Sequence, residues 1–571
     1  MARRRRGKWI LIGVLLLVGI AVALSRGSEP TVAEGSYVVV RIEGSYAEGQ
    51  PKNQITKLFD ERKVLVELLD TLRKVRADPR IPGVVARIGP LETGWAQTRE
   101  IRDALAALRA ADKRVVSFMS SEIIGGNKEY YLASVGDEVL LASAAAPMLN
   151  GLSAHYYFLG ALWEKLHIAM EVEQIREYKT FGDLLKRRSM SPAHREMADS
   201  VLDDINDEFL STIAEARGLT VEETQEIVNS CPSSAGDFVE AGLADDVLFF
   251  DELSTRIDTD RVVEFIDAEE YAAVSLASVG LGGGARIAVI HAVGTIVPGK
   301  GGRRGLMGST VGSRPLVKAF RTAADDDSIS AIVFRIDSPG GSAMASDDVW
   351  RATRLAREKK PVVTSFGNVA ASGGYYMAAG TDHIVAEPTT LTGSIGVVLF
   401  KPNVAGLLGW MGIGTESLGR GRYSRIMDTS KGLDRAEASL LRGQMDGVYK
   451  RFLDRVAEGR AMTVEEVDRV GGGRVWTGHQ ALEEGLIDEL GGLEQAVRAA
   501  AVEAQVEDPS SVELVYLPEL KGLLDQLMHL QSSRMSANVP AVLSDAIESL
   551  APYAGLETGI HVITDAIPAI R

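Results

Sequence analysis

The chain has 571 residues, of which 46% are apolar and 25% charged, and its formal net charge is −16. This length exceeds one ordinary hydrophobic core, so we expect at least two domains, and the acidic balance excludes nucleic acid as a partner of the bulk of the chain. The single cysteine, Cys231, excludes an intrachain disulfide, and its polar, proline-flanked setting gives no sign of a catalytic role. The histidines are scattered without metal-ligand spacing, so we expect no metal.

The N-terminal segment differs from the rest of the chain. Basic residues 3–6 and Lys8 precede an apolar run over residues 9–24. The run is intermediate in length between a signal-peptide core and a membrane-spanning helix. We expect a retained anchor over residues 1–26, with cleavage near residues 21–23 as the alternative. In both cases the basic cluster stays in the cytoplasm and the acidic bulk lies outside it.

Apolar segments after this anchor alternate between strand and helix patterns. Short apolar runs predict strands, and runs with apolar residues at spacings of three and four predict helices. In the first half the expected order is strand 37–42, helix 58–75, strand 84–88, helix 101–108 and strand 115–118. In the second half it is strand 287–290, helix 316–324, strand 332–336, helix 347–356 and strand 362–366. This alternation predicts an α/β fold with largely parallel sheets.

The two halves also match in sequence. Arg87 and Arg335 are 248 positions apart, as are the Ser-Phe pairs at 117 and 365, while the Tyr-Tyr pairs at 130 and 375 are 245 apart. A slowly changing offset indicates an internal duplication with small insertions and deletions. We therefore expect two tandem repeats, over 36–275 and 285–505, joined near the glycine-rich residues 280–284. The tail, 506–571, contains an amphipathic helix pattern near 520–530.

Residues 368–376 of the second repeat surround Ser372 with small residues. Two alanines precede this serine and two glycines follow it. Such a hydroxyl has no large side chain beside it, and glycines let backbone N–H groups approach a carbonyl, although a simple helix cap is the alternative. The matching position in the first repeat is Asn127, followed by Lys128 and Glu129. A cap alone would not require the glycines, so the difference favours a catalytic serine in the second repeat.

In a second difference between the repeats, the first repeat has the candidate catalytic residue and the second lacks it. Lys179 of the first repeat matches Ser424 of the second at the same offset of 245. One repeat thus has the lysine without the serine, and the other has the serine without the lysine. Each repeat therefore resembles half of a catalytic pair.

Several motifs together resemble one family of enzymes. They are residues 178–179, 190–193, 338–341, 371–375 and 392–396, in this order. Together with the N-terminal segment, they resemble the S49 family of membrane-bound bacterial serine peptidases in its long, duplicated form. This resemblance, which covers about residues 1–500, implies two Clp protease/crotonase-like domains. Residues 181–183 depart from the family pattern.

The resemblance also implies a role for each site residue. Ser372 matches the nucleophile, Lys179 the general base, and Ser394 the serine that orients the lysine. Backbone N–H groups of three glycines match the oxyanion donors: Gly340, Gly341 and Gly373. A lysine acts as a base only when burial removes its charge, and the apolar parts of Tyr178 and Phe181 are expected to contribute to this burial.

The function implied is a membrane-bound serine endopeptidase that cleaves hydrophobic peptides such as remnant signal peptides. It needs no cofactor. The resemblance places it in the bacterial inner membrane as a single-pass protein, with the catalytic part on the extracytoplasmic side. A crotonase-like enzyme acting on an acyl-thioester is one alternative, and a noncatalytic membrane scaffold is another.

The complementary losses suggest how copies assemble. In a single-copy ancestor each site would take its lysine from one subunit and its serine from the next. Fusion would bring one complete pair, Lys179 with Ser372, into one chain, and the junction between chains would hold Asn127 and Ser424 and be inert. The family resemblance makes a homotetramer the expected assembly.

Overall fold

The computed structural model describes residues 30–49, 63–120, 126–303, 309–518 and 561–563. The expected anchor and the amphipathic pattern near 520–530 lie outside these residues. Within the described part of the chain, no helix has both the length and the apolar run needed to cross a membrane. The boundaries drawn for the two repeats stay predictions.

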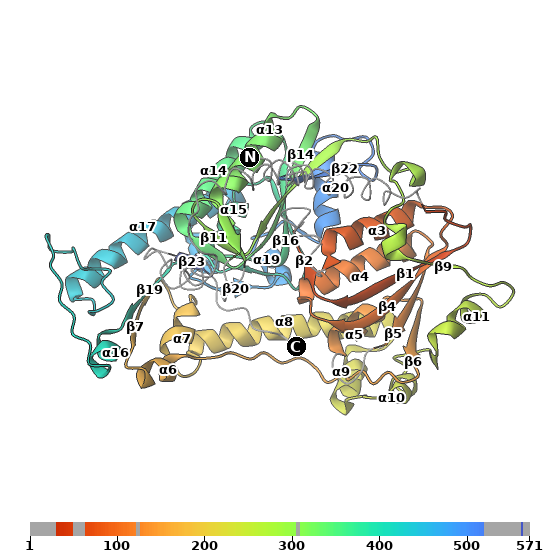
Figure 1. Cartoon of the computed structure of the whole chain (residues 1–571), viewed down its shortest axis with the longest axis horizontal. Helices are drawn as coiled ribbons and strands as arrows, with labels where there is room; N and C mark the ends of the chain where they lie inside the picture. Colours follow the sequence, from red (N-terminus) through yellow and green to blue (C-terminus); the bar gives the residue numbers. More distant parts are fainter. Residues whose placement is uncertain (1–29, 50–62, 121–125, 304–308, 519–560, 564–571) are drawn as a thin grey trace, which may run out of the picture.

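The first repeat is built on a fully parallel six-stranded sheet in the order β8-β6-β5-β4-β1-β9 (Figure 1). Its strands are β1 (Tyr37–Gly44), β4 (Gly83–Leu91), β5 (Arg114–Met119), β6 (Glu138–Ala142), β8 (Asp246–Leu248) and β9 (Phe265–Asp267). The valine-rich strands are buried on both faces, as parallel sheets require. The helices that complete the βαβ units are α3 (Leu65–Ala77), α4 (Trp95–Ala110) and α5 (Asn127–Ala133).

The second repeat has the same plan. Its sheet runs β20-β18-β16-β14-β10-β22, with β17 paired to β16 and β21 paired to β17. The strands are β10 (Arg286–Val293), β14 (Ile329–Ser338), β16 (Val362–Ala371), β17 (His383–Ala386), β18 (Leu391–Gly393), β20 (Val475–Trp476), β21 (Glu489–Leu490) and β22 (Glu513–Leu517). The helices are α13 (Ser313–Asp325), α14 (Ala343–Arg357), α15 (Gly373–Ala378) and α20 (Leu493–Glu503). The predicted duplication of an α/β unit is confirmed.

Two local expectations were wrong. Residues 63–64 form strand β3, so helix α3 begins at Leu65 rather than at 58, and positions 58–62 lie outside the described residues. The second error is the offset of 248 between the strands at 115–118 and 362–366, which was taken from the Ser-Phe pairs at 117 and 365. Val84 pairs with Val115, whereas its counterpart Ile332 pairs with Val362, so these strands match at an offset of 247. The connection before β16 is one residue shorter than its counterpart.

A third, mixed sheet joins the two repeats, and it was not predicted from the sequence. Strand β7 (Ala169–Gln174) leaves the first repeat and pairs antiparallel with β19 (Val398–Asn403) of the second. The same sheet holds β15 (Gly340–Ser342), and β23 (His561–Ile563) lies between β15 and β19. Helix α8 (Pro192–Arg217) runs alongside from the first repeat toward α7 (Phe181–Lys186), as Figure 1 shows. The first repeat therefore extends over the second.

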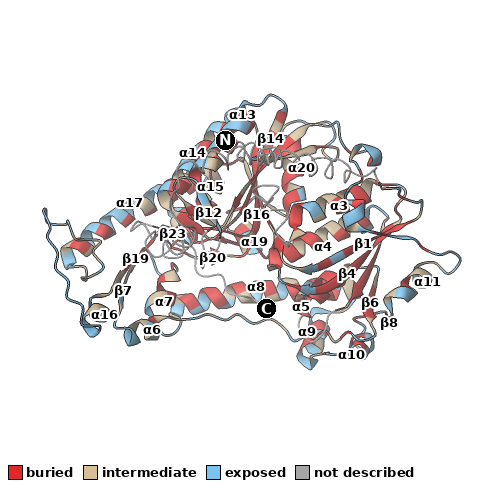
Figure 2. Ribbon diagram, in the orientation of Figure 1, coloured by how far each residue is buried: buried red, intermediate tan, exposed pale blue. Residues whose placement is uncertain are grey.

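Buried charges also hold the repeats together. Arg335 of β14 is 1% exposed and pairs with Glu48 at 2.9 Å and Glu100 at 2.6 Å, both from the first repeat. Figure 2 shows buried residues along the strands of both sheets. In contrast to these buried strands, α16 (Ala405–Trp410) and the loop after it are largely exposed.

Candidate active site

Ser372 stands at the turn between strand β16 and helix α15. It is completely buried, and its backbone has φ +54° and ψ −113°. Few non-glycine residues adopt this combination of angles; such strained conformations cost about 1–3 kcal/mol and cluster at functional sites. The side chain makes no capping hydrogen bond to α15, while the backbone N–H donates to the Gly393 carbonyl at 2.8 Å. The simple helix cap considered above is therefore not the arrangement found.

Lys179 reaches this serine from the other repeat. It follows β7 and precedes α7, and it is completely buried. Its Nζ lies 2.8 Å from the Ser372 Oγ, 2.8 Å from the Ser394 Oγ and 2.9 Å from the Ser394 carbonyl oxygen. The pairing of β7 with β19 places the lysine here, since Ile175 continues the ladder by donating to the Val397 carbonyl. All three of these hydrogen bonds go to uncharged oxygens.

Ser394 holds the lysine from a second strained turn. It follows β18, which pairs with β16 next to Ser372, and its φ is +50°. The backbone N–H donates to the Arg474 carbonyl, which fixes the turn against the residues before β20. Both oxygens of Ser394 thereby point to the lysine amine.

A glycine loop that the sequence analysis missed encloses Lys179. A Cβ added to Gly473 would lie 2.3 Å from the Lys179 backbone nitrogen, and one added to Gly396 would lie 3.1 Å from its Cδ. The Tyr178 N–H also donates to the Gly472 carbonyl at 3.2 Å. Three consecutive glycines at 471–473 were the available signal. Of the aromatic residues expected here, Phe181 packs near Phe400.

The three predicted oxyanion glycines lie beside Ser372. The Gly340 N–H donates to the Ser338 Oγ at 3.2 Å. A Cβ on Gly373 would lie 3.1 Å from the Gly341 nitrogen, so these two residues are in close contact. Gly340 also has φ +103°, a conformation that favours glycine. A Cβ on Gly341 would collide with the Ile296 backbone, and one on Gly373 would lie 2.6 Å from the Ser346 Oγ, so both positions require glycine.

Strand β23 lies between β15 and β19, next to Gly340 and Gly341. It is antiparallel to β15, with Val562 opposite Gly341, and antiparallel to β19, with His561 opposite Val398. An extended backbone therefore fits between β15 and β19, alongside the turn that carries Ser372.

The corresponding place in the first repeat is filled differently. The Asn127 Nδ2 donates to the Asn150 Oδ1 at 3.0 Å and to the Gly151 carbonyl at 2.8 Å. The Lys128 Nζ donates to the Thr93 carbonyl. Ser424, the counterpart of Lys179, is exposed. The side chains of Asn127 and Lys128 thus form hydrogen bonds within the first repeat.

Two titratable groups near the site, Asp337 and His291, have shifted pKa values. Asp337, just before the Ser338 motif, accepts a hydrogen bond from the Val369 N–H at 3.0 Å. Burial and the nearby charge of Glu48 raise the pKa of Asp337 to about 7. Burial lowers the pKa of neighbouring His291 to about 4. At neutral pH this histidine is therefore uncharged.

This fold and site define a duplicated α/β chain in which one repeat brings a buried lysine to a buried serine of the other. Comparison with known proteins agrees with that class. The family model described as "Peptidase family S49" matches residues 107–264 and 354–507. A chloroplastic serine protease SPPA of Arabidopsis thaliana is 36% identical, with 87% of this chain and 72% of that protein covered. Protease 4 of Salmonella typhi is 29% identical, with 94% and 88% covered. The chain belongs to peptidase family S49, and its relatives support a serine peptidase.

Proposed function

We propose that this protein is a membrane-bound serine endopeptidase in which Lys179 and Ser372 perform the chemistry. The single observation that supports this most strongly is the 2.8 Å separation of the Lys179 Nζ and the Ser372 Oγ in a fully buried site. Such a distance permits direct proton transfer. Burial disfavours the charged form of the amine, and its contacts with Ser372 and Ser394 go to uncharged oxygens.

The proposed reaction begins with a neutral lysine. The Ser372 hydroxyl donates to the amine lone pair, and the Nζ takes the proton as the Oγ attacks the peptide carbonyl carbon. The resulting ammonium then gives this proton to the leaving amine nitrogen as the C–N bond breaks, which leaves an ester on Ser372. Water, deprotonated by the same amine, attacks the ester carbonyl, and the ammonium returns that proton to the Ser372 Oγ as the ester C–O bond breaks and the acid product leaves. Ser394 orients the Nζ in both steps.

Gly341 and Gly373 are the proposed oxyanion donors. Their close approach supports this choice, and the Gly340 N–H already donates to Ser338. Two donors fixed before the reaction stabilise the developing negative charge, and loss of one such donor typically costs about 10²–10³ in rate.

The proposed substrate is an extended, hydrophobic peptide such as a remnant signal peptide. The backbone pairing of β23 along β15 and β19 supports a substrate that adds as a strand. The basic cluster and apolar run of residues 1–24 support attachment to the bacterial inner membrane, with the catalytic repeats on the extracytoplasmic side. The proposed assembly is a homotetramer.

Peptidase assays on three variants of the full-length chain test the proposal. Ser372→Ala should reduce cleavage of a hydrophobic peptide to background. Lys179→Met should reduce it by about 10²–10⁴-fold through loss of the base. Lys401→Met is the matched control, because Lys401 is equally buried but pairs with Glu171 at 3.1 Å. Full activity in folded Lys179→Met would remove lysine from the mechanism.

The alternatives predict different results. An acyl-thioester enzyme would turn over acyl-coenzyme A with Ser372 replaced by alanine. A scaffold would show no hydrolysis in any variant. The contact between Lys179 and Ser372 favours the peptidase over both, since neither alternative needs a Ser–Lys pair.

A further inference from the structure

The glycine loop at 471–473 encloses Lys179, and this loop is itself held from two sides. On one side, the Gly473 N–H donates to the carbonyl of Ile395, the neighbour of Ser394, at 2.9 Å. On the other side, the Gly472 N–H donates to the Tyr449 Oη at 3.1 Å. Tyr449 has no part in the chemistry proposed above, so its contact with the loop needs another explanation.

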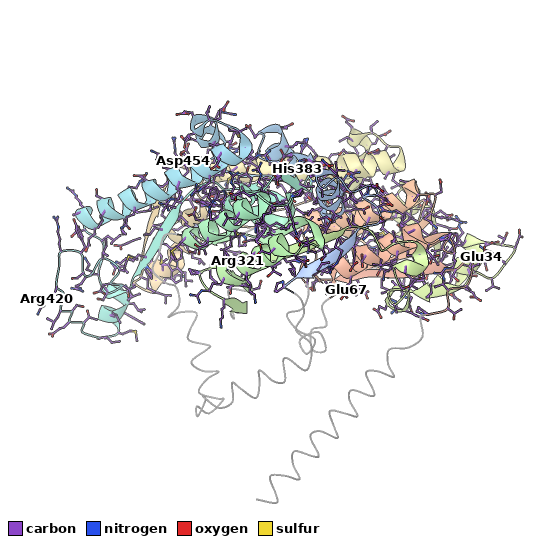
Figure 3. All side chains as sticks on the ribbon, turned by 90° about the horizontal axis from the view of Figure 1, so that it is seen from above. Glu34, Glu67, Arg321, His383, Arg420 and Asp454 are labelled. Atoms are coloured by element: carbon purple, nitrogen blue, oxygen red, sulfur yellow. The ribbon has the colours of Figure 1, made fainter. Side chains whose placement is uncertain are left out.

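Tyr449 reaches the loop from the inner side of helix α17 (Arg435–Arg460). It is 7% exposed, whereas Asp454, five positions further along the same helix, is exposed. Figure 3 labels Asp454 on the outer surface of α17. With about 3.6 residues per turn, five positions place the two side chains on nearly opposite sides of the helix. The tyrosine hydroxyl is therefore directed inward, to the glycine loop.

The hydrogen bonds of this hydroxyl have a fixed direction. The Tyr449 Oη donates to the Asp468 Oδ1, on helix α18 (Val464–Val470), at 2.6 Å. An ionised carboxylate only accepts, so the single hydroxyl proton goes to Asp468 and an oxygen lone pair is left for the Gly472 N–H. Burial and the hydrogen bond to Asp468 raise the pKa of Tyr449, so the hydroxyl keeps its proton. The aspartate thus orients the acceptor that holds the loop.

The same aspartate also holds the segment that leads into Lys179. Its Oδ2 accepts a hydrogen bond from the Arg176 Nη2, three positions before the lysine. Arg176 has φ +67°, so the chain turns sharply there. The circuit closes one residue before the lysine, because the Tyr178 N–H donates to the Gly472 carbonyl at 3.2 Å. Arg176 is half-exposed, so we expect the buried Tyr449–Gly472 contact to contribute more than this ion pair.

The first repeat lacks the parts of this circuit. Helix α8 matches α17, and α9 (Val221–Ser230) matches α18, at an offset of 243. At that offset Asn206 replaces Tyr449 and Gln225 replaces Asp468. The three glycines are replaced by residues 228–230, Val-Asn-Ser, which are the last turn of α9. Packing of the helix pair therefore does not need these residues, which occur only in the repeat that receives the lysine.

We propose that Tyr449 and Asp468 are positioning residues that hold the Lys179 amine at the Ser372 hydroxyl. This inference rests on the proposed Ser–Lys function. Neither residue touches the reacting atoms; both act through Gly472 on the loop whose Gly473 contacts the Lys179 backbone. A displacement of about 1 Å can lower a rate by about 10²-fold, so movement of this loop should be felt in the proton transfer.

Removal of one hydroxyl tests the inference. Tyr449→Phe in the full-length chain leaves the ring in place and the buried Gly472 N–H without its acceptor. We expect kcat for a hydrophobic peptide to fall by about 10–100-fold. The KM should stay within about twofold, because the proposed peptide path along β15 and β19 keeps its residues.

Tyr130→Phe is the matched control. Tyr130 is completely buried, and its Oη donates to the Leu243 carbonyl at 2.8 Å within the first repeat. This variant loses an equally buried hydroxyl without touching the lysine loop, so it should keep the wild-type kcat. Urea midpoints of both variants identify conditions under which each remains folded. A general effect of losing a buried hydroxyl would lower activity in both.

A double variant tests whether the two residues act as one unit. Asp468→Ala should lower kcat as Tyr449→Phe does, because the hydroxyl loses the partner that orients it. If both act through Gly472, the double variant should be no more than about twofold worse than the poorer single variant. Losses that multiply would mean two independent effects and would refute the circuit. Should Asp468→Ala fail to fold, Tyr449→Phe and its control decide alone.

The outcomes separate this inference from the proposed function. Folded Tyr449→Phe with wild-type kcat, or with a changed KM alone, overturns the positioning role while Lys179→Met still shows the lysine to be required. Full activity in Lys179→Met instead removes the Ser–Lys mechanism itself. A fall in kcat for Tyr449→Phe, unchanged KM and a fully active Tyr130→Phe are the results that support the inference.

Discussion

The guanidinium of Arg335 is buried between two carboxylates of the first repeat, those of Glu48 and Glu100. Its Nε and Nη2 contact Glu48, its Nη1 and Nη2 contact Glu100, and its Nη1 also donates to the Ser365 Oγ and the Phe366 carbonyl. Removing one partner of a buried ion pair leaves uncompensated charge. This residue lies three positions before Ser338, so it also connects the junction of the repeats to the glycines proposed as oxyanion donors.

Replacement of Arg335 should therefore be costly. We expect Arg335→Met to lower the free energy of unfolding by about 3–5 kcal/mol, measured by urea denaturation. Arg87→Met is the matched control, since no carboxylate of the described residues pairs with this partly buried counterpart, and it should lose far less. Equal losses in the two variants would show that the buried ion pairs contribute nothing particular.

Asp337 predicts a pH dependence of stability. The unfolded carboxyl titrates near pH 4, whereas its folded pKa is raised to about 7. Between these values the folded chain keeps a proton that the unfolded chain releases, so this group's contribution to stability falls as pH rises from about 4 to about 7. Asp337→Asn removes that proton exchange. Its stability should thus gain relative to wild type over this range, as measured by urea midpoints. Parallel profiles would contradict the raised pKa.

Among the structural elements, the loop 471–473 positions the lysine by close contact. A Cβ on Gly473 would collide with the Lys179 backbone, and its φ of +91° also favours glycine. Gly473→Ala should therefore lower kcat, because the Nζ moves away from the Ser372 Oγ. Gly485→Ala is the control, since its φ is +70° but its added Cβ meets nothing within 4 Å.

The two variants separate backbone strain from displacement of the lysine. Both should lose stability by about 1 kcal/mol or more, since each puts alanine at a positive φ. Only Gly473→Ala should lose peptidase activity at a temperature where both remain folded. Equal activities would mean that this loop does not position Lys179.

Features that depend on neighbouring residues could be predicted from the sequence, whereas contacts between residues far apart in the chain could not. Strands and helices were visible because apolar periodicity is local. The meeting of Ser372, Lys179 and Ser394 was predicted from complementary differences between the repeats and from the family resemblance. The mixed sheet containing β7 and β19 and the ion pairs of Arg335 with Glu48 and Glu100 were not predicted. They join residues more than 200 positions apart and leave no local pattern.

At the scale of the whole molecule, duplication allowed the repeats to specialise. Strand β7 and Lys179 of the first repeat pack against the second repeat. In the first repeat the counterpart of Ser372 is Asn127, whose side-chain amide donates hydrogen bonds to the loop at Asn150 and Gly151. The second repeat keeps the glycines and the strained serine. One chain therefore contains one complete copy of the proposed Ser–Lys site, and the proposed chemistry requires both repeats in a fixed arrangement.

Co-expression of two inactive chains tests this claim most directly. Full-length Ser372→Ala and Lys179→Met chains, carrying different affinity tags, would be purified together as mixed assemblies and assayed on a hydrophobic peptide. If the lysine and serine of one chain act together, every site in the mixture lacks one partner, and activity should not exceed that of either variant alone. Recovery of a substantial fraction of wild-type activity would mean that the pair forms between chains, contrary to the arrangement found here.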